Sequence, residues 1–278
     1  MIRVVELYSF YGALGALVVS ALILIPASIS RRRAASAKPS ATSTRLTSSG
    51  LILQAVGLAS LTLSVVARAI ITGHGPFSNM YEFSIAFAWG ILVAGLLFWR
   101  RYRTLTVDGL SITVAVGLLI FASQLPSRHV PLVPALQQSL LLTFHVAAAV
   151  AAYGSFTVGF VSALLFIWQE SRPSLRLPRP ETLEDISYRS VVIGFPLMTL
   201  VIILGALWAD VAWGRYWGWD PKETASLVTW LIYAGYLHAR FIRGWRGTKA
   251  AILLVAGFCA VLLTFFGNYI FSGLHSYT

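Results

Sequence analysis

The run SVVIGFPLMTLVIILGALW, residues Ser190–Trp208, contains no charged side chain. Because a helix needs about 20 predominantly apolar residues to cross about 30 Å of hydrocarbon, this run predicts a membrane-spanning helix. The sequence WGRYWGWD, Trp213–Asp220, follows it and leads into a second apolar run, Ala225–Phe241. Four large aromatic side chains within seven positions, set between two such runs, make this connection the most distinctive stretch of the chain.

The composition of the whole chain agrees with a protein of many membrane spans. Of its 278 residues, 57% are hydrophobic and 11% are charged, whereas soluble domains carry about 25% charged residues. Backbone groups in lipid must be satisfied internally, and apolar runs of this length favour helices. We therefore predict an all-α fold, a polytopic membrane helical bundle that forms a single integral membrane domain over residues 1–278.

Eight apolar segments can be drawn, and an even number places both termini on one side of the membrane. The segments are Leu7–Ile29, Leu51–Ile71, Phe83–Phe98, Leu105–Leu125, Ser139–Trp168, Ser190–Trp208, Ala225–Phe241 and Ala250–Phe271. The first has no clear cleavage site and is followed by its basic cluster rather than preceded by it, so we expect a retained span. The sequence thus predicts about eight transmembrane helices.

The basic residues predict the orientation. Sixteen of the 21 lysines and arginines lie in loops after odd-numbered segments: Arg31, Arg32, Arg33, Lys38, Arg45, Arg100, Arg101, Arg103, Arg172, Arg176, Arg179, Arg189, Arg240, Arg243, Arg246 and Lys249. Such loops are cytoplasmic in membrane proteins, so both termini and the aromatic connection are expected to be extracytoplasmic. The net charge of +11 is then a topology signal, and no nucleic-acid partner is expected.

Residues 209–224 are predicted to form an extracytoplasmic tryptophan-rich loop, and residues 31–50 a flexible cytoplasmic loop. In a helical turn, Trp213 and Trp217 would line an aromatic patch beside one lined by Gly214 and Gly218. A flat ligand could lie there, with Tyr216 and Trp219 adding to the platform. The alternative is an aromatic belt at the headgroup level, although belts usually place one or two aromatics at each helix end.

The end of this loop predicts a helix start. Asp220 fits the N-cap position and Glu223 the N3 position of a capping box, while Pro221 fits N1. We favour this capping role for Asp220 over direct ligand contact. Lys222 and Arg215 are among the few cations of the outer face and could pair with anionic groups such as propionates, or alternatively with lipid phosphates.

Two histidines lie within the apolar segments, where ionisable residues are candidates for function. His145 lies roughly 9 Å below the outer end of its segment and His238 roughly 20 Å. A depth difference on the order of 10 Å excludes their acting as opposite axial ligands of one metal, whose bonds are about 2 Å long. A packing role through hydrogen bonds is the alternative for each.

The other three histidines lie in outer loops or in the C-terminal segment, where one of them could supply a second metal ligand. His145 could be partnered by an outer histidine, with His74, His129 and His275 as candidates, whereas a second ligand beside His238 would have to come from another chain. A planar metal complex held by histidines and cradled by tryptophans fits these features, which indicates haem with bis-histidine ligation. The only cysteine, Cys259, lies in an apolar run, so any thiol chemistry must come from a partner.

Two stretches resemble a known family. WGRYWGWDPKET, Trp213–Thr224, followed by TWLIYAGYLHAR, Thr229–Arg240, is similar to the tryptophan-rich "WWD" signature of the CcsA/ResC-type proteins of system II cytochrome c biogenesis. Further matches are Gly73–Glu82, Val133–Gln137, His145-Val146, Ser187–Arg189 and Gly273–Tyr277. The resemblance runs from about Gly73 to the C-terminus, and Ala225 departs from it where relatives often carry another tryptophan.

The resemblance implies a function. His145 and His275 match the histidines that ligate the iron of b-type haem at the outer face, and His238 matches an intramembrane histidine that holds haem in transit. The expected function is haem export and presentation within a holocytochrome c synthase, which joins haem to a CxxCH apocytochrome c. The expected partners are a ResB/CcsB-type membrane subunit, apocytochrome c and a thioredoxin-like thiol reductant.

Two other classes remain as alternatives. A b-type haem electron-transfer subunit usually needs two histidine pairs on facing spans, and this chain offers one intramembrane histidine at each depth. A permease without a cofactor would leave the histidine depths and the aromatic loop unexplained. The expected location is a bacterial plasma membrane, with a thylakoid membrane as the alternative.

Overall fold

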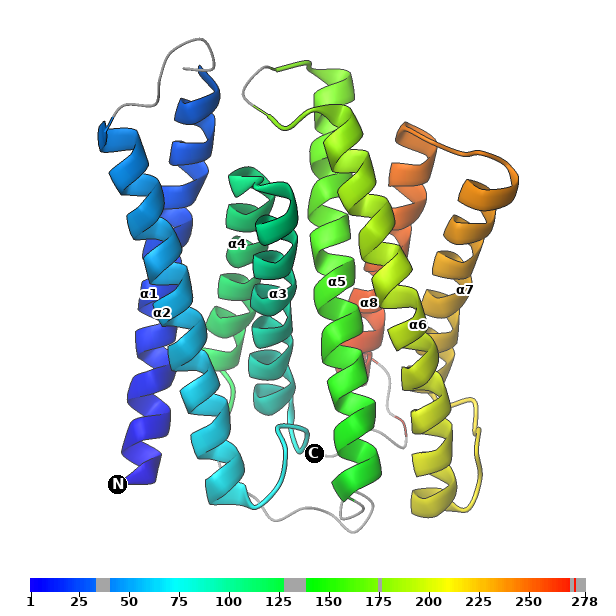
Figure 1. Ribbon diagram of the computed structural model, residues 1–278. Helices are drawn as coiled ribbons and strands as arrows, with labels where there is room; N and C mark the ends of the chain where they lie inside the picture. The colour runs from blue at the N-terminus through cyan, green and yellow to red at the C-terminus, as the bar shows by residue number, and fades with distance from the viewer. Residues whose placement is uncertain (34–40, 128–138, 175–176, 271–272, 274–278) are drawn as a thin grey trace.

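The protein is a bundle of eight helices in the part of the chain that the computed structural model describes, residues 1–33, 41–127, 139–174, 177–270 and 273. The helices are α1 (Ile2–Arg33), α2 (Ala41–Thr72), α3 (Met80–Tyr102), α4 (Leu105–Ser123), α5 (Ser139–Ser171), α6 (Pro180–Trp213), α7 (Pro221–Ile242) and α8 (Thr248–Ile270). They run side by side along one axis, with α1 beginning and α8 ending at the same end (Figure 1). The predicted all-α bundle is confirmed.

Seven of these helices are long and apolar enough to cross a membrane. The exception is α7, whose 22 residues include Lys222, Glu223, His238 and Arg240 and two tyrosines. It nevertheless lies beside α6 and α8 in the bundle (Figure 1). The chain is an integral membrane protein with multiple spans, and α7 is the one described helix that is not apolar enough by itself to be recognised as a span.

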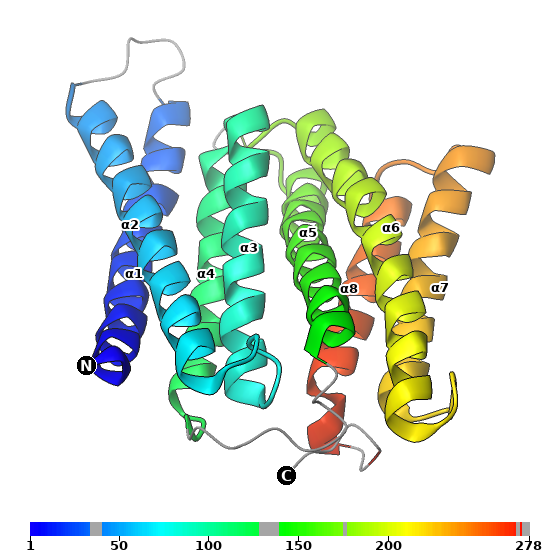
Figure 2. The same ribbon diagram turned by 60° about the horizontal axis from the view of Figure 1, so that its bottom comes forward.

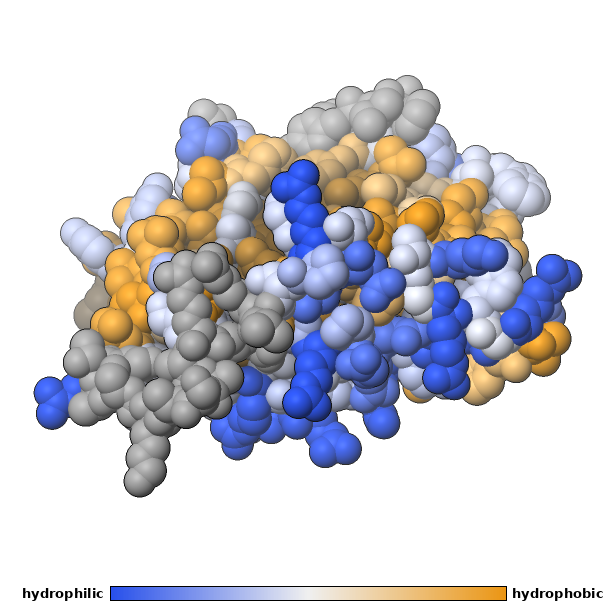
Figure 3. Space-filling model, turned by 90° about the horizontal axis from the view of Figure 1, so that it is seen from above, coloured by the Kyte–Doolittle hydropathy of each residue, from blue (hydrophilic) through white to orange (hydrophobic). Residues whose placement is uncertain are grey.

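The end of the bundle opposite to the chain's first residue is rich in hydrophilic side chains (Figure 3). It carries the connections that follow α3, α5 and α7, where exposed arginines such as Arg103, Arg172 and Arg243 lie. The other end carries the α2–α3 and α6–α7 connections, which Figure 2 turns towards the viewer. We name it the outer end, following the orientation that the basic residues predict.

Two predicted loops are shorter in the structure. Helix α2 begins at Ala41, and the Ser20 hydroxyl donates to the Gly50 carbonyl at 2.8 Å, so residues 41–50 are helical and pack on α1. No proline or glycine interrupts residues 41–49, which explains the continuation. Residues 34–40 of that predicted loop lie outside the described residues. The tryptophan-rich loop is only Gly214–Asp220, because α6 continues to Trp213.

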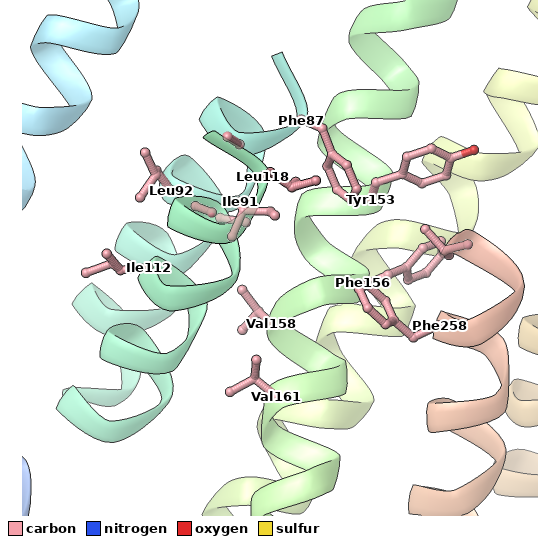
Figure 4. Close-up of a cluster of buried hydrophobic side chains, with 14 of the residues drawn as sticks. Phe87, Ile91, Leu92, Ile112, Leu118, Tyr153, Phe156, Val158, Val161 and Phe258 are labelled. Atoms are coloured by element: carbon pink, nitrogen blue, oxygen red, sulfur yellow. The ribbon is translucent and has the colours of Figure 1, made fainter. Parts of the chain in front are cut away.

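A close contact between α3 and α5 sets the position of α5. A Cβ atom on Gly154 would lie 2.4 Å from the Gly90 carbonyl oxygen, so only glycine permits this approach. Around it, the apolar core joins α3, α4, α5 and α8, including Ile91, Phe156 and Phe258 (Figure 4). The packing therefore fixes the helix that carries His145.

Candidate functional site

A cavity of about 270 Å³ lies among five helices near the outer end. Its walls come from the α2–α3 and α6–α7 connections and from α3, α5, α6, α7 and α8. The described residues that line it include Phe77, Phe83, His145, Tyr153, Trp208, Tyr216, Trp217, Lys222, Glu223, Ser226 and Phe265. Most of them are aromatic or apolar, with a few polar groups among them, as is typical of a ligand pocket.

His145 enters this cavity from the second turn of α5. Its Nδ1 lies 2.9 Å from the Val201 carbonyl oxygen on α6. Because a carbonyl can only accept, Nδ1 carries the hydrogen, and a metal ion would bind through Nε2. The ring lies over Gly205, where a Cβ atom would come within 2.9 Å of the imidazole Cε1. Helix α6 thus both orients the ring and leaves space for it.

The four aromatic residues of the WGRYWGWD stretch, one at the end of α6 and three in the loop, divide into two groups. Tyr216 and Trp217 line the cavity, whereas Trp219 is 69% exposed and Trp213 packs edge-on against Trp208 with ring centroids 4.8 Å apart. Trp208, only 2% exposed, lines the cavity although the sequence placed it merely at the end of an apolar segment. Trp208 and Trp213 are five residues apart, whereas neighbours on one helix face are three or four apart, so the sequence pattern did not predict that they would be in contact.

The loop backbone is not helical, which corrects the expected pair of patches on a helical turn. Gly214 ends α6 in the left-handed conformation (φ 72°, ψ 22°), and Trp219 also has a positive φ of 55°. Gly218 instead packs under the guanidinium of Arg215, where a Cβ atom would lie 3.0 Å from Cζ. Arg215 itself is exposed and does not line the cavity.

The predicted capping box is confirmed. The Asp220 carboxylate accepts from the backbone N–H of Lys222 at 3.1 Å, and Asp220 is buried. Glu223 Oε2 accepts from the backbone N–H groups of Gly218 at 2.8 Å and of Asp220 at 3.2 Å. These bonds fold the loop back onto α7, so Trp217 is presented to the cavity by a fixed backbone.

Lys222 is the cation of the cavity. Its ammonium lies 4.9 Å from the centre of the Phe83 ring, close enough for a cation–π contact. Desolvation by burial lowers the pKa of Lys222 to about 8, while the charge of Asp220 acts in the opposite direction. Lys222 precedes the apolar part of α7, and a partly buried cation that lines the cavity favours an anionic ligand group.

The structure places the other histidines separately. His238 is exposed on α7 and does not line the cavity. His74 is buried and packs near Phe77, with its Nδ1 2.7 Å from the Gly75 carbonyl. His275 and His129 lie outside the described residues. Gly273, two residues before His275 in the sequence, lies against the N-cap of α7, where a Cβ atom would be 2.4 Å from Asp220 Oδ1.

Sequence reasoning missed one buried charge network near the cavity. Arg68, which lies within the second apolar segment, pairs with Glu6 at 2.8 Å and with Glu82 at 2.7 Å. Neither partner was a candidate, because the pairs join residues 62 and 14 positions apart in three helices. Among the described residues, no group of three or more His, Cys, Asp and Glu could hold a metal ion.

Comparison with known proteins gives a consistent picture. A family model described as "Cytochrome C assembly protein" matches residues 77–275. A "Cytochrome c biogenesis protein CcsA" of Gloeothece citriformis is 36% identical over 81% of this chain and 88% of its own length. The CcsA proteins of Gloeobacter violaceus and Synechocystis sp. are 35% and 34% identical, each over 80% of this chain and over 84% and 86% of their own lengths.

A solved structure has the same fold. The "Cytochrome c Heme Lyase CcmF" superposes with a TM-score of 0.62 at 18% identity over 96% of this chain. This chain spans 47% of that larger chain, so it matches about half of it. At this level of identity, the likeness supports the arrangement of the helices alone.

Proposed function

Because this chain belongs to the cytochrome c assembly protein family and is similar to CcsA proteins, its role lies in cytochrome c biogenesis, and we propose that it presents haem at the outer face. In this proposal, a synthase complex receives haem through this subunit and attaches it to apocytochrome c. The observation that carries the proposal is His145, oriented by Val201 in a cavity lined by tryptophan and tyrosine.

The residues of the cavity fit a b-type haem as the bound substrate. His145 would bind the iron through Nε2, and His275 would supply the second ligand from the C-terminal tail. Gly273 lies against Asp220 at the base of the tryptophan loop, which supports a tail that reaches this site. Trp208 and Trp217 offer faces and edges to the ring, and Lys222 offers a charge to its carboxylates.

The chain's contribution to the reaction is positioning. Haem supplies two vinyl groups, and each cysteine S–H adds across one of them, forming a C–S and a C–H bond with no net oxidation. Two axial histidines leave the edge of the ring available, and the fixed loop Gly214–Asp220 limits how the ring can rotate. Orientation of reacting groups is a large source of rate acceleration. A ResB/CcsB-type subunit and a thioredoxin-like reductant complete the proposed assembly.

The test of this function uses the complex with its ResB/CcsB-type subunit. The purified complex is expected to show the absorption spectrum of a low-spin bis-histidine haem, and cells that contain it to attach haem covalently to a CxxCH apocytochrome. Haem staining of the denatured cytochrome measures the product. A complex that oxidises quinol but leaves the apocytochrome without haem would instead support the electron-transfer alternative.

The charge of Lys222 gives a separate prediction. Lys222→Met is expected to weaken haem retention by about tenfold, since a charge-assisted hydrogen bond contributes about 1.5–3 kcal/mol. The matched control is Arg215→Met, which removes an exposed cation outside the cavity and is expected to have little effect. With haem dimethyl ester, whose carboxylates are blocked, wild type and Lys222→Met should bind equally. A persisting difference would show that Lys222 acts in some other way.

The same residue predicts a pH dependence. The Lys222 ammonium is present below its pKa of about 8 and is lost above it. Haem retention by the wild-type complex should therefore fall as the pH rises through about 8. Lys222→Met should not show this fall between pH 7 and 9.

A further inference from the structure

The network around Arg68 connects three helices and a loop. The guanidinium, 1% exposed, donates through Nε to Glu82 Oε1 at 2.7 Å and through Nη1 to Glu6 Oε1 at 2.8 Å. Nη1 also donates to the Ser127 carbonyl at 3.1 Å. Buried charges of this kind must be paired, because an unpaired one costs several kcal/mol.

The second oxygen of Glu82 holds the α2–α3 connection, residues 73–79. Glu82 Oε2 accepts from the backbone N–H of Ser78 at 2.9 Å and from its hydroxyl at 2.7 Å. The Asn79 side chain caps α3 by accepting from the Glu82 N–H at 3.0 Å. One carboxylate therefore joins Arg68 on α2 to Ser78 in this loop.

This loop forms a wall of the cavity. Phe77, which precedes Ser78 and is 1% exposed, packs in a cluster with Leu142, Val146 and Trp208. Phe77, Ser78 and Asn79 all line the cavity that holds His145. A shift of Ser78 would therefore move Phe77 away from Trp208 and change the shape of the pocket.

We propose that Arg68 and Glu82 are positioning residues of the haem site: Arg68 fixes the Glu82 carboxylate, and Glu82 fixes the loop that carries Phe77. This inference rests on the proposed function, because it assigns the shaped cavity to haem. A network that only held helices together would not need the second carboxylate oxygen to bind a loop. Here, both bonds of Glu82 Oε2 go to Ser78.

Two conservative variants separate these roles. Glu82→Gln leaves a balanced Arg68–Glu6 pair, but its single oxygen cannot serve both Arg68 and Ser78. Glu6→Gln leaves a balanced Arg68–Glu82 pair with the loop still held, and it is the matched control. In the complex with the partner subunit, Glu82→Gln is expected to lower haem retention by about tenfold without rescue by imidazole, since no iron ligand is lost. Glu6→Gln should retain haem as the wild type does.

A measurement independent of haem completes the test. Because Leu142 itself lines the cavity, this measurement uses complexes prepared without haem. In a Cys259→Ser background, Leu142→Cys places a thiol against Phe77, and its rate of reaction with a water-soluble maleimide reports whether the loop has lifted. The rate should rise by about tenfold in Glu82→Gln and stay unchanged in Glu6→Gln, matching the haem result. Equal rates in the two variants would overturn the proposal, and so would a lifted loop with normal haem retention. A wild-type complex without haem contradicts the proposed function instead, and the maleimide rates still decide whether Glu82 holds the loop.

Discussion

Replacing His145 by alanine is expected to remove the outer haem from the purified complex and to abolish covalent attachment to apocytochrome c. Even the loss of a residue that only supports a ligand typically costs 10–100-fold in metal affinity, so loss of the ligand should cost at least about 100-fold. Absorption spectroscopy of the complex and haem staining of the cytochrome measure the two effects. The complex itself should still assemble, because His145 is only partly buried.

Imidazole distinguishes a lost ligand from a damaged cavity. The space vacated in His145→Ala lies beside Gly205 and can accept a free imidazole, so millimolar imidazole should restore the low-spin spectrum and part of the activity. The same rescue is expected for His275→Ala. If both variants keep the wild-type haem content and spectrum without imidazole, the outer site is wrongly assigned.

Gly205 provides a companion variant that leaves every candidate ligand in place. A Cβ atom in Gly205→Ala would lie 2.9 Å from Cε1 and 3.2 Å from Nδ1 of His145. The ring must then shift and weaken its bond to Val201, so haem retention should fall by about tenfold, within the range for lost support of a ligand. Imidazole should help little here, since the displaced histidine still occupies the space. Gly235→Ala is a control, because its Cβ meets nothing within 4 Å.

The sequence predicted the helices better than the connections. Long apolar runs report membrane spans directly, and the eight segments correspond to α1–α8. The ends were less visible. Residues 41–50 continue α2 without enough apolar residues to signal it, and Asp210 interrupts the apolar run of α6 although the helix continues to Trp213. Capping residues predicted a helix end correctly where they are present: the Asp220–Glu223 capping box marks the start of α7.

The candidate site was predicted in part. Charge and hydropathy placed His145, Lys222 and Trp217 at the same end, where they line one cavity. Arg68, Glu6 and Glu82 were not recognised as a network, because long-range ion pairs leave no periodic pattern in a single sequence. Arg215 and Trp219 were expected beside a ligand and lie outside the cavity, because the two positive φ values turn the loop away from a helix.

His238 does not line the cavity and lies on the outside of the bundle. It is exposed on α7, seven residues after Leu231, which is also exposed and lies on the same helix face. An ionisable side chain directed at lipid is costly, so such residues usually meet a partner group. A second chain that supplies a ligand beside His238 would satisfy it, which is the arrangement we propose for haem in transit.

We therefore expect His238→Ala to leave the outer site without haem although His145 and His275 are intact. The reason is supply rather than affinity: haem that cannot be held within the membrane does not arrive at the outer cavity. Added imidazole should fail to restore the outer spectrum, in contrast to His145→Ala, whereas haem added to the purified complex from the outer side should bind normally. Leu231→Ala is the matched control, since it trims the same face of α7 without removing a ligand. Normal loading of the outer site in cells that carry His238→Ala would remove the transit role.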